Sequence, residues 1–395
     1  MSLLIHKDYL GMGTHALLKD SMISWTKSED AVMTYGFPDD HRSIEPLFKI
    51  FDCKIPELVP EKFRKAMQAC NAKNPFWSAV IPKSYYNKKF KEVVQHVADS
   101  YSEITGSSYY EVYTQSNQVF DKLKSSRLNT ALCKSILKDE DNHVIRGVLS
   151  SSEDGYCAPP IYDRASTKTG RLTITKGPQV LTLKKEYRSV FQARCKDSKI
   201  YEVDFSSLEP RVASNIARRE PGDDVYSSFM EYAGINISRD AAKLAVLCSL
   251  YGAGKYSLEK QLKAQDSTMN AAALLKKVSE YFLAKELSDK LRDEFVETDR
   301  IENYFGRPIV VDDPRPTVLL NNYLQSTAVD VSLLGFEKMS TDLSNCISPL
   351  FIIHDAMFFE AKPSSLTRVN EYLSKGFEIT GLGRFPLKVT EFVGK

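Results

Sequence analysis

A single acidic residue inside an otherwise apolar run constrains the fold of this chain most. Asp355 lies within Phe-Ile-Ile-His-Asp-Ala-Met-Phe-Phe at residues 351–359, with apolar side chains on both sides. A carboxylate among such neighbours is costly unless a cation or a metal compensates its charge. The run predicts a β-hairpin near Leu350–Glu360. The alternative is a tight turn that merely places His354 and Asp355 in solvent, and the run alone does not decide between them.

A second carboxylate ends a predicted strand. Residues 199–205 alternate in character, so one set of side chains faces a core and the other set faces away from it. Asp204 belongs to the second set and is expected at the edge of a sheet. The first set is Tyr201, Val203 and Phe205, and the second is Ile200, Glu202 and Asp204.

A helix predicted to open at Ser238, an N-cap candidate, carries a distinctive side chain at every fourth position. Steps of four residues keep these side chains on one broad helix face. Such a face fits a triphosphate at its start and a base or sugar further along. The alternative is a solvated cationic stripe. The four residues are Arg239, Lys243, Leu247 and Tyr251.

Global composition excludes some classes of protein but does not select one. The 53 Lys and Arg nearly cancel the 51 Asp and Glu, which leaves a net charge of +2. The seven cysteines form no CxxC pair, which argues against a disulfide framework and a zinc ribbon and favours a reducing cytoplasm. No signal peptide and no run of about 18 apolar residues is present, so no membrane association is expected.

Charge is concentrated locally instead. Residues 164–196 contain nine cations and, among acids, only Glu186. Lys and Arg interleaved with Thr, Ser and Gln are what contacts to nucleic-acid phosphates require, with a solvated basic surface as the alternative. The cations are Arg164, Lys168, Arg171, Lys176, Lys184, Lys185, Arg188, Arg194 and Lys196.

Together these segments resemble the polymerase domain of family A DNA polymerases, the DNA polymerase I family with its phage members. Residues 204–211, D-F-S-S-L-E-P-R, are similar to the first family motif, D-Y-S-Q-I-E-x-R. Residues 239–252 match R-x3-K-x7-Y-G, and residues 353–355 resemble the start of V-H-D-E. T-G-R-L at 169–172 and N-x3-Q-S-T-A-x-D at 321–330 stand in the family's order.

The resemblance implies an α+β fold shaped as a right hand, with a thumb, a palm built on an antiparallel sheet, and helical fingers. Residues 1–82 form a region of unknown role in this scheme. The expected subdomains are thumb-like helices at 83–140, a palm with the basic DNA-contact segment at 141–235, fingers at 236–304 and the second part of the palm at 305–395.

The resemblance also implies a template-directed DNA polymerase that extends a primer 3′ end by two-metal nucleotidyl transfer. Asp204, Asp355 and the carbonyl of Phe205 would hold two Mg²⁺ ions, with Mn²⁺ as a possible substitute. Asp204, Asp355 and Lys243 are the expected catalytic residues, and Lys243 could protonate pyrophosphate. The partners are primer–template DNA and dNTPs in the cytoplasm of a bacterial or phage-infected cell.

The resemblance also implies nucleotide-binding and DNA-binding roles for the residues at matching motif positions. Arg239, Lys243, Leu247 and Tyr251 are expected to bind the nucleotide, and Glu209 matches the steric gate that excludes a ribose 2′-hydroxyl. The remaining residues are expected to contact DNA, chiefly at the primer end and in the minor groove. They are Arg171, Asn321, Gln325, His354 and Arg188.

Three departures from the family pattern qualify these expectations. Ala356 replaces an acidic residue, Leu247 replaces Phe or Tyr, and no Asp-x-Glu precedes Lys199 to open a proofreading exonuclease site. A separate exonuclease or processivity factor is therefore a possible partner. A single-subunit RNA polymerase is one alternative, which Glu209 disfavours, and an inactive nucleic-acid-binding polymerase fold, suggested by Ala356, is another.

Overall fold

The computed structural model describes residues 2–19, 22–38, 40, 42–72, 75–253, 255–263 and 270–392. The chain forms two compact units, Met1–Glu111 and Val112–Lys395. None of the seven cysteines, all of which lie in the described ranges, is disulfide-bonded.

The N-terminal unit is built on a four-stranded sheet with the order β3-β2-β1-β4. β1 pairs with β2 in antiparallel and with β4 in parallel orientation, and β2 pairs with β3 in antiparallel orientation. Leu3, Leu4 and Ile5 of the central strand are almost fully buried. The strands are β1 (Ser2–Ile5), β2 (His15–Lys19), β3 (Met22–Thr26) and β4 (Met33–Tyr35).

Helices complete this unit, and the longest of them, α5, begins after Pro82. Its buried residues include Val93, Val94 and Val97. The hydroxyl of Tyr86 on α5 donates a hydrogen bond of 2.8 Å to the carbonyl of Leu10. The helices are α1 (Lys7–Leu10), α2 (Glu45–Ile50), α3 (Glu61–Ala69), α4 (Trp77–Val80) and α5 (Lys83–Gly106).

The second unit contains an antiparallel sheet with the order β14-β15-β11-β18. β11 spans Lys199–Phe205, the bounds that alternation predicts, and β14 with β15 forms the predicted hairpin. Helices and an antiparallel sheet thus coexist, as expected for an α+β protein. The other strands are β14 (Ile347–Ile353), β15 (Ala356–Ala361) and β18 (Leu387–Glu391).

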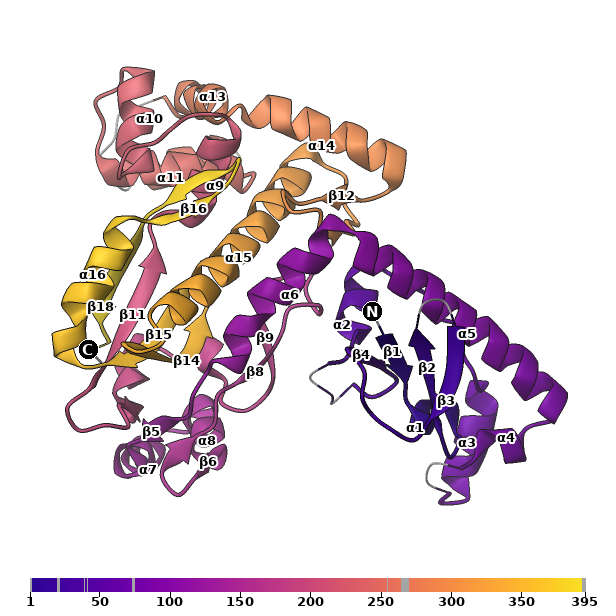
Figure 1. Cartoon of the computed structure of the whole chain (residues 1–395). Coiled ribbons are helices and arrows are strands. Elements are labelled where there is room, and N and C mark those ends of the chain that lie inside the picture. Colours follow the sequence, from indigo (N-terminus) through magenta and orange to yellow (C-terminus); the bar gives the residue numbers. More distant parts are fainter. Residues whose placement is uncertain are drawn as a thin grey trace. The chain divides into compact units, whose positions relative to one another are not determined.

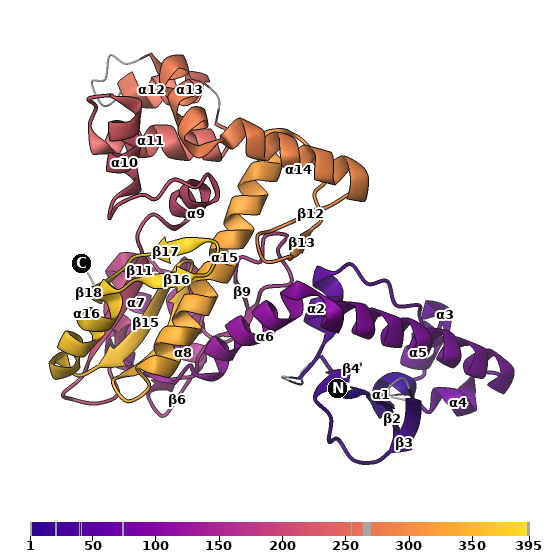
Figure 2. The same ribbon diagram turned by 45° about the horizontal axis from the view of Figure 1, so that its top comes forward.

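The two faces of this sheet enter different cores. Tyr201, Val203 and Phe205 pack in a large cluster with helices, whereas Ile200 packs in a smaller cluster on the opposite face, so the predicted alternation is confirmed. Helix α15 (Pro316–Asp342) crosses the sheet on the side of the large cluster (Figures 1 and 2). A Cβ atom placed on Gly335 of α15 would lie 2.6 Å from the ring of Phe205, which shows how closely helix and strand approach.

Helices α10–α13 gather beyond the end of this sheet, toward α14 (Figures 1 and 2). α11 packs against α10, α12 and α13. The side chain of Ser238 accepts a hydrogen bond of 3.1 Å from the amide of Ala241, so the predicted N-cap of α11 is confirmed. The helices are α9 (Leu208–Ile216), α10 (Val225–Ala233), α11 (Arg239–Leu250), α12 (Lys255–Lys263), α13 (Ala271–Phe282) and α14 (Ala284–Thr298).

Shorter elements surround this sheet and contribute to both the smaller and the large cluster. Helix α6 (Ser108–Asp121) leads into them from the N-terminal side. The helices are α7 (Thr130–Asp139), α8 (His143–Ser150) and α16 (Leu366–Ser374). The strands are β5 (Ser126–Leu128), β6 (Ser152–Glu153), β7 (Tyr156–Cys157), β8 (Ile161–Asp163), β9 (Thr173–Lys176), β10 (Phe191–Gln192), β12 (Ile301–Glu302), β13 (Pro308–Ile309), β16 (Phe377–Ile379) and β17 (Gly383–Phe385).

Candidate nucleotide and metal site

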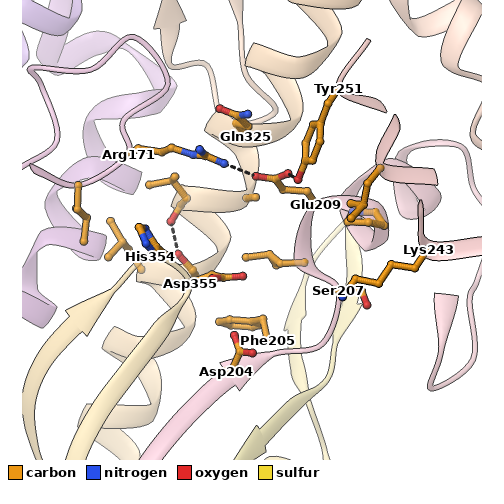
Figure 3. A pocket seen from close by; sticks show the side chains of 18 of the residues that line it. Arg171, Asp204, Phe205, Ser207, Glu209, Lys243, Tyr251, Gln325, His354 and Asp355 are labelled. Atoms are coloured by element: carbon orange, nitrogen blue, oxygen red, sulfur yellow. Dashed lines mark hydrogen bonds and ion pairs between the residues drawn. The ribbon is translucent and has the colours of Figure 1, made fainter. Parts of the chain in front are cut away.

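The sheet brings the two predicted carboxylates to one place. Asp204 is the penultimate residue of β11, and it pairs with Ala356, the first residue of β15. Asp355 directly precedes Ala356 in the two-residue turn between β14 and β15, where His354 adopts a left-handed φ of 54°. Both carboxylates line a pocket of about 500 Å³ (Figure 3).

The electrostatics of this pair are those of a site that favours cations. Solvent reaches the carboxylate of Asp204 through the pocket, yet protein surrounds it on most sides. Desolvation by this surrounding, followed by the nearby charge of Asp355, raises the pKa of Asp204 to about 7. Two hard oxygen donors of like charge, held together, are a donor set that suits Mg²⁺ or Mn²⁺. The residues present therefore fit the metal ions that the family resemblance implies.

One face of α11 forms a wall of the same pocket. Lys243, Leu247 and Tyr251 line it, as their spacing of four residues predicts (Figure 3 labels Lys243 and Tyr251). Lys243 is exposed, and among the described residues no ion pair is recorded for its ammonium group. Arg239, at the start of α11, does not line the pocket. Its guanidinium instead pairs with Asp224, with Nε–Oδ2 and Nη2–Oδ1 distances of 3.0 and 2.8 Å.

Glu209 lies at the centre of a short hydrogen-bonded chain across the pocket. Nη2 of Arg171 donates to Oε1 of Glu209 over 3.0 Å, and the hydroxyl of Tyr251 donates to Oε2 (Figure 3). Desolvation and the charge of Glu209 raise the pKa of Tyr251 above its usual range, so this hydroxyl remains a donor. These two hydrogen bonds connect the loop before β9, the first turn of α9 and the end of α11.

Helix α15 contributes polar side chains to the other side of the pocket. Gln325 lines it and donates from Nε2 to Oδ1 of Asn321, one turn earlier, over 2.7 Å. Asn321 itself does not line the pocket. His354 lies beside Asp355 in the hairpin turn and also lines it (Figure 3).

Arg188, which is expected to contact DNA, does not line this pocket. Its side chain is buried, donates from Nη1 to Oε2 of Glu202 over 2.6 Å, and packs over the rings of Phe358 and Phe392 at 5.2 and 5.3 Å. A guanidinium enclosed in this way stabilises the smaller core of the sheet and is not presented to a polyanion. We therefore leave Arg188 out of the proposed DNA contacts.

Most cations of the basic segment that contains Arg188 are paired, five of them with acids outside the segment. Ion pairs of this kind cannot be read from the segment itself, where Glu186 is the only acid. Six of its nine cations are paired, in Arg164–Asp330, Lys168–Asp312, Arg171–Glu209, Lys184–Glu186, Arg188–Glu202 and Arg194–Glu360. No ion pair is recorded within the described part of the chain for the exposed Lys176, Lys185 and Lys196.

Sequence reasoning missed several residues around the site. Ser207 joins β11 to α9 with a left-handed φ of 55° and lines the pocket with Tyr226. Asp224 caps α10 by accepting from the amide of Ser227, a pattern that N-cap rules could have found. Arg211 is almost fully buried within α9, and only the fold reveals its contacts.

A second group of possible metal ligands lies in the N-terminal unit. Among the described residues, His6, His15 and Glu29 are close enough to share an ion. However, Nδ1 of His6 accepts the amide N–H of Asp8, and Nδ1 of His15 accepts that of Lys7, at 3.3 and 3.2 Å. A neutral imidazole that accepts at Nδ1 carries its proton at Nε2 and has no lone pair there for a metal. These hydrogen bonds argue against a metal centre at this position.

The model of DNA polymerase family A matches residues 121–395. This match covers well over half of the chain, and the chain therefore belongs to DNA polymerase family A. The matched region includes the whole pocket described above.

Comparison with solved structures gives a more distant likeness. The polymerase domain of Pol1 from M. smegmatis, solved in complex with DNA primer–template and dNTP, is 18% identical and aligns with a TM-score of 0.48. The match covers 63% of this chain and 50% of that one, so this chain spans about half the length of its match. No curated protein matches the sequence. Among the described residues, no helix is both long and apolar enough to cross a membrane.

Proposed function

We propose that this chain is a template-directed DNA polymerase that adds deoxynucleotides to a primer 3′ end. The observation that supports this most directly is the Asp204–Asp355 pair in a pocket walled by Lys243 and Tyr251. In this proposal the sheet of β14, β15, β11 and β18 belongs to the palm, and the helices within residues 236–304, α11–α14, are the fingers. The helices within residues 83–140 act as the thumb.

Asp204 and Asp355, with the main-chain carbonyl of Phe205, would hold two Mg²⁺ ions. When bound, such ions lower the pKa of the primer 3′-hydroxyl and neutralise the charge of the leaving pyrophosphate. The protein contributes the fixed spacing of the carboxylates, since Asp204 is held by the strand ladder and Asp355 by the turn that the ladder closes. With Ala356 at the next position, the neighbouring side chain is apolar and buried, so it adds no third carboxylate.

Lys243 is the group that meets the triphosphate. Its exposed ammonium lines the pocket on the wall formed by α11. It would bind a phosphate oxygen as a point charge and would deliver a proton to the leaving pyrophosphate. Arg239, one turn earlier, supplies a second phosphate contact once its guanidinium is turned toward the pocket.

The sugar and the base meet the remaining wall. Glu209 fills the space of a ribose 2′-hydroxyl, and its hydrogen bonds to Arg171 and Tyr251 hold it there. Leu247 lies beside the sugar and the ring of Tyr251 beside the base. Arg171, Asn321, Gln325 and His354 are the proposed contacts to the primer end and the minor groove.

Primer extension tests this function. With Mg²⁺ and a primer–template, the chain should incorporate dNTPs far better than NTPs, and the D204A and D355A variants should bind the DNA yet lose extension by several orders of magnitude. Preferred use of NTPs would identify an RNA polymerase instead. Extension that survives either substitution would remove that aspartate from the metal site, and DNA binding without any extension would indicate an inactive fold.

We also propose that the chain does not degrade primers from the 3′ end, so that any proofreading comes from a separate exonuclease. In support, no Asp-x-Glu, the pattern that opens the family's exonuclease site, occurs in the sequence before Lys199. The purified chain, incubated with a 3′-mismatched, end-labelled primer and Mg²⁺ but no nucleotides, should leave the primer intact. Shortening that persists in D204A would reveal an overlooked exonuclease site.

A further inference from the structure

The guanidinium of Arg239 lies outside the pocket, where it donates two hydrogen bonds to the carboxylate of Asp224. A phosphate would accept the same two hydrogen bonds. We propose that Asp224 is a positioning residue that competes with the triphosphate for Arg239 and thereby sets the affinity for the incoming nucleotide. The inference rests on the proposed function of the pocket, but it concerns a residue that lies outside it.

The contact between the two side chains is bidentate. Nε and Nη2 of Arg239 reach different carboxylate oxygens of Asp224, at 3.0 and 2.8 Å. This is the geometry in which a guanidinium also binds phosphate, so it cannot engage both anions in this way at once. Lys243, one turn further along α11, lines the pocket, whereas Arg239 does not. Of these two cations on α11, Arg239 is the one whose charge is engaged outside the pocket.

Asp224 is the fixed member of the pair. Its Oδ2 accepts from the amide and the hydroxyl of Ser227, at 3.2 and 2.7 Å, and so caps α10. The loop before it is held by the buried Arg211, whose guanidinium donates to the carbonyls of Pro221, Gly222 and Asp223 at 3.2, 2.9 and 2.9 Å. The movable member is therefore Arg239, whose side chain is 52% exposed against 28% for Asp224.

The ring of Tyr226 connects this pair to the pocket. Tyr226 lines the pocket, and the guanidinium of Arg239 lies over its ring at 5.0 Å from the centroid. Arg239 therefore rests on a wall of the nucleotide site while its charge is satisfied outside. Entry of a triphosphate must replace the Asp224 pair, and the free energy of that pair is subtracted from nucleotide binding.

The test is the binding of dATP with Mg²⁺ to the free chain, without DNA. D224N removes the charge yet retains the capping oxygen, because Asn is a good N-cap residue. A partly exposed pair is worth up to about 1 kcal/mol, so the Kd of dATP should fall by about two- to fivefold. Inhibition of extension by tripolyphosphate should strengthen by the same factor, while the single-turnover rate at saturating dNTP stays unchanged.

Two controls separate this mechanism from a general loss of negative charge. D223N removes the same charge from the neighbouring residue, whose carbonyl but not carboxylate is used here, and should leave the Kd unchanged. In an R239A background, D224N should change nothing, since Asp224 acts through Arg239. D224S keeps a capping hydroxyl but is too short to reach Arg239, and it should reproduce D224N if the Asn variant folds poorly.

An unchanged or raised Kd in folded D224N or D224S overturns the inference, as does an equal effect in D223N or a persistent effect in R239A. Its failure can be told apart from failure of the proposed function. Tighter dATP binding by D224N in a chain that extends no primer would refute the polymerase activity alone. Normal extension with an unaltered Kd would refute the role of Asp224 alone.

Discussion

At the scale of single residues, the Asp204 carboxyl shows how the fold prepares its site. Its pKa is raised to about 7 by desolvation and by Asp355, whereas an unfolded Asp titrates near pH ~3.9. Between pH ~4 and about 7, the folded chain therefore keeps a proton on Asp204 that the unfolded chain has already lost. Its contribution to stability is present below about pH 4 and is lost as the pH rises through about 7.

We therefore predict that, with a chelator present, the advantage of D204N over the unaltered chain in thermal stability is larger at pH ~8 than at pH ~5. The amide cannot ionise, so the substituted chain escapes the cost of holding a partly desolvated charge beside Asp355. Thermal unfolding at both pH values measures the difference. Mg²⁺ should stabilise the unaltered chain more at pH 8 than at pH 5, because protons compete with the ion. An equal effect of D204N at both pH values would contradict this account.

Single residues also show where sequence reasoning reached its limit. The spacing of four places Lys243, Leu247 and Tyr251 correctly on one wall, because helix periodicity is a local property. It could not show that Arg188 is buried against Glu202 or that Arg239 turns to Asp224. Those outcomes depend on which acid the fold brings near, and such contacts leave no pattern in a short window.

At the scale of elements, strands with strong alternation were predictable and short ones were not. β11 has the predicted bounds, and the hairpin of β14 and β15 surrounds the predicted turn. The three- to five-residue strands β1–β4 went unrecognised, because so few residues establish no period. Their pairing adds a parallel contact between β1 and β4 that only the folded unit reveals.

The close approach of α15 and β11 gives a prediction at this scale. G335A should lower the free energy of unfolding by about 1–3 kcal/mol, because the added methyl group would lie 2.6 Å from the buried ring of Phe205. Extension should fall with it, since Phe205 adjoins Asp204. The matched control is G147A in α8, where nothing lies within 4 Å of the added atom. That change should stabilise by up to about 1 kcal/mol through helix propensity. A G335A chain as stable as G147A would refute the tight contact.

At the scale of the whole molecule, the balance of charge bears on DNA binding. The net charge is +2, and six of nine cations in residues 164–196 are already paired. Each phosphate neutralised adds about 0.9 to the slope of log affinity against log salt. Replacing Lys176, Lys185 and Lys196 together with Ala should therefore reduce that slope by about 3.

The matched control replaces Lys168 and Lys184, whose charges are offset by Asp312 and Glu186. It should reduce the slope by less than one. Measurements of primer–template affinity from low to moderate salt, by fluorescence anisotropy, supply both numbers. A loss near 2 in the control would mean that these ion pairs open when DNA binds.

The strand ladder that carries Asp204 has a consequence for how such a chain can change in length. Asp204 faces its site because it is paired with Ala356, and side chains along a strand alternate between faces. Inserting or deleting one residue within β11 ahead of Asp204 would turn the later side chains of this strand over and send the carboxylate to the opposite face of the sheet. Two residues would restore the face but displace the carboxylate along the strand. Extra length can therefore accumulate in the connections of this domain, whereas the number of residues in β11 that precede Asp204 must stay constant.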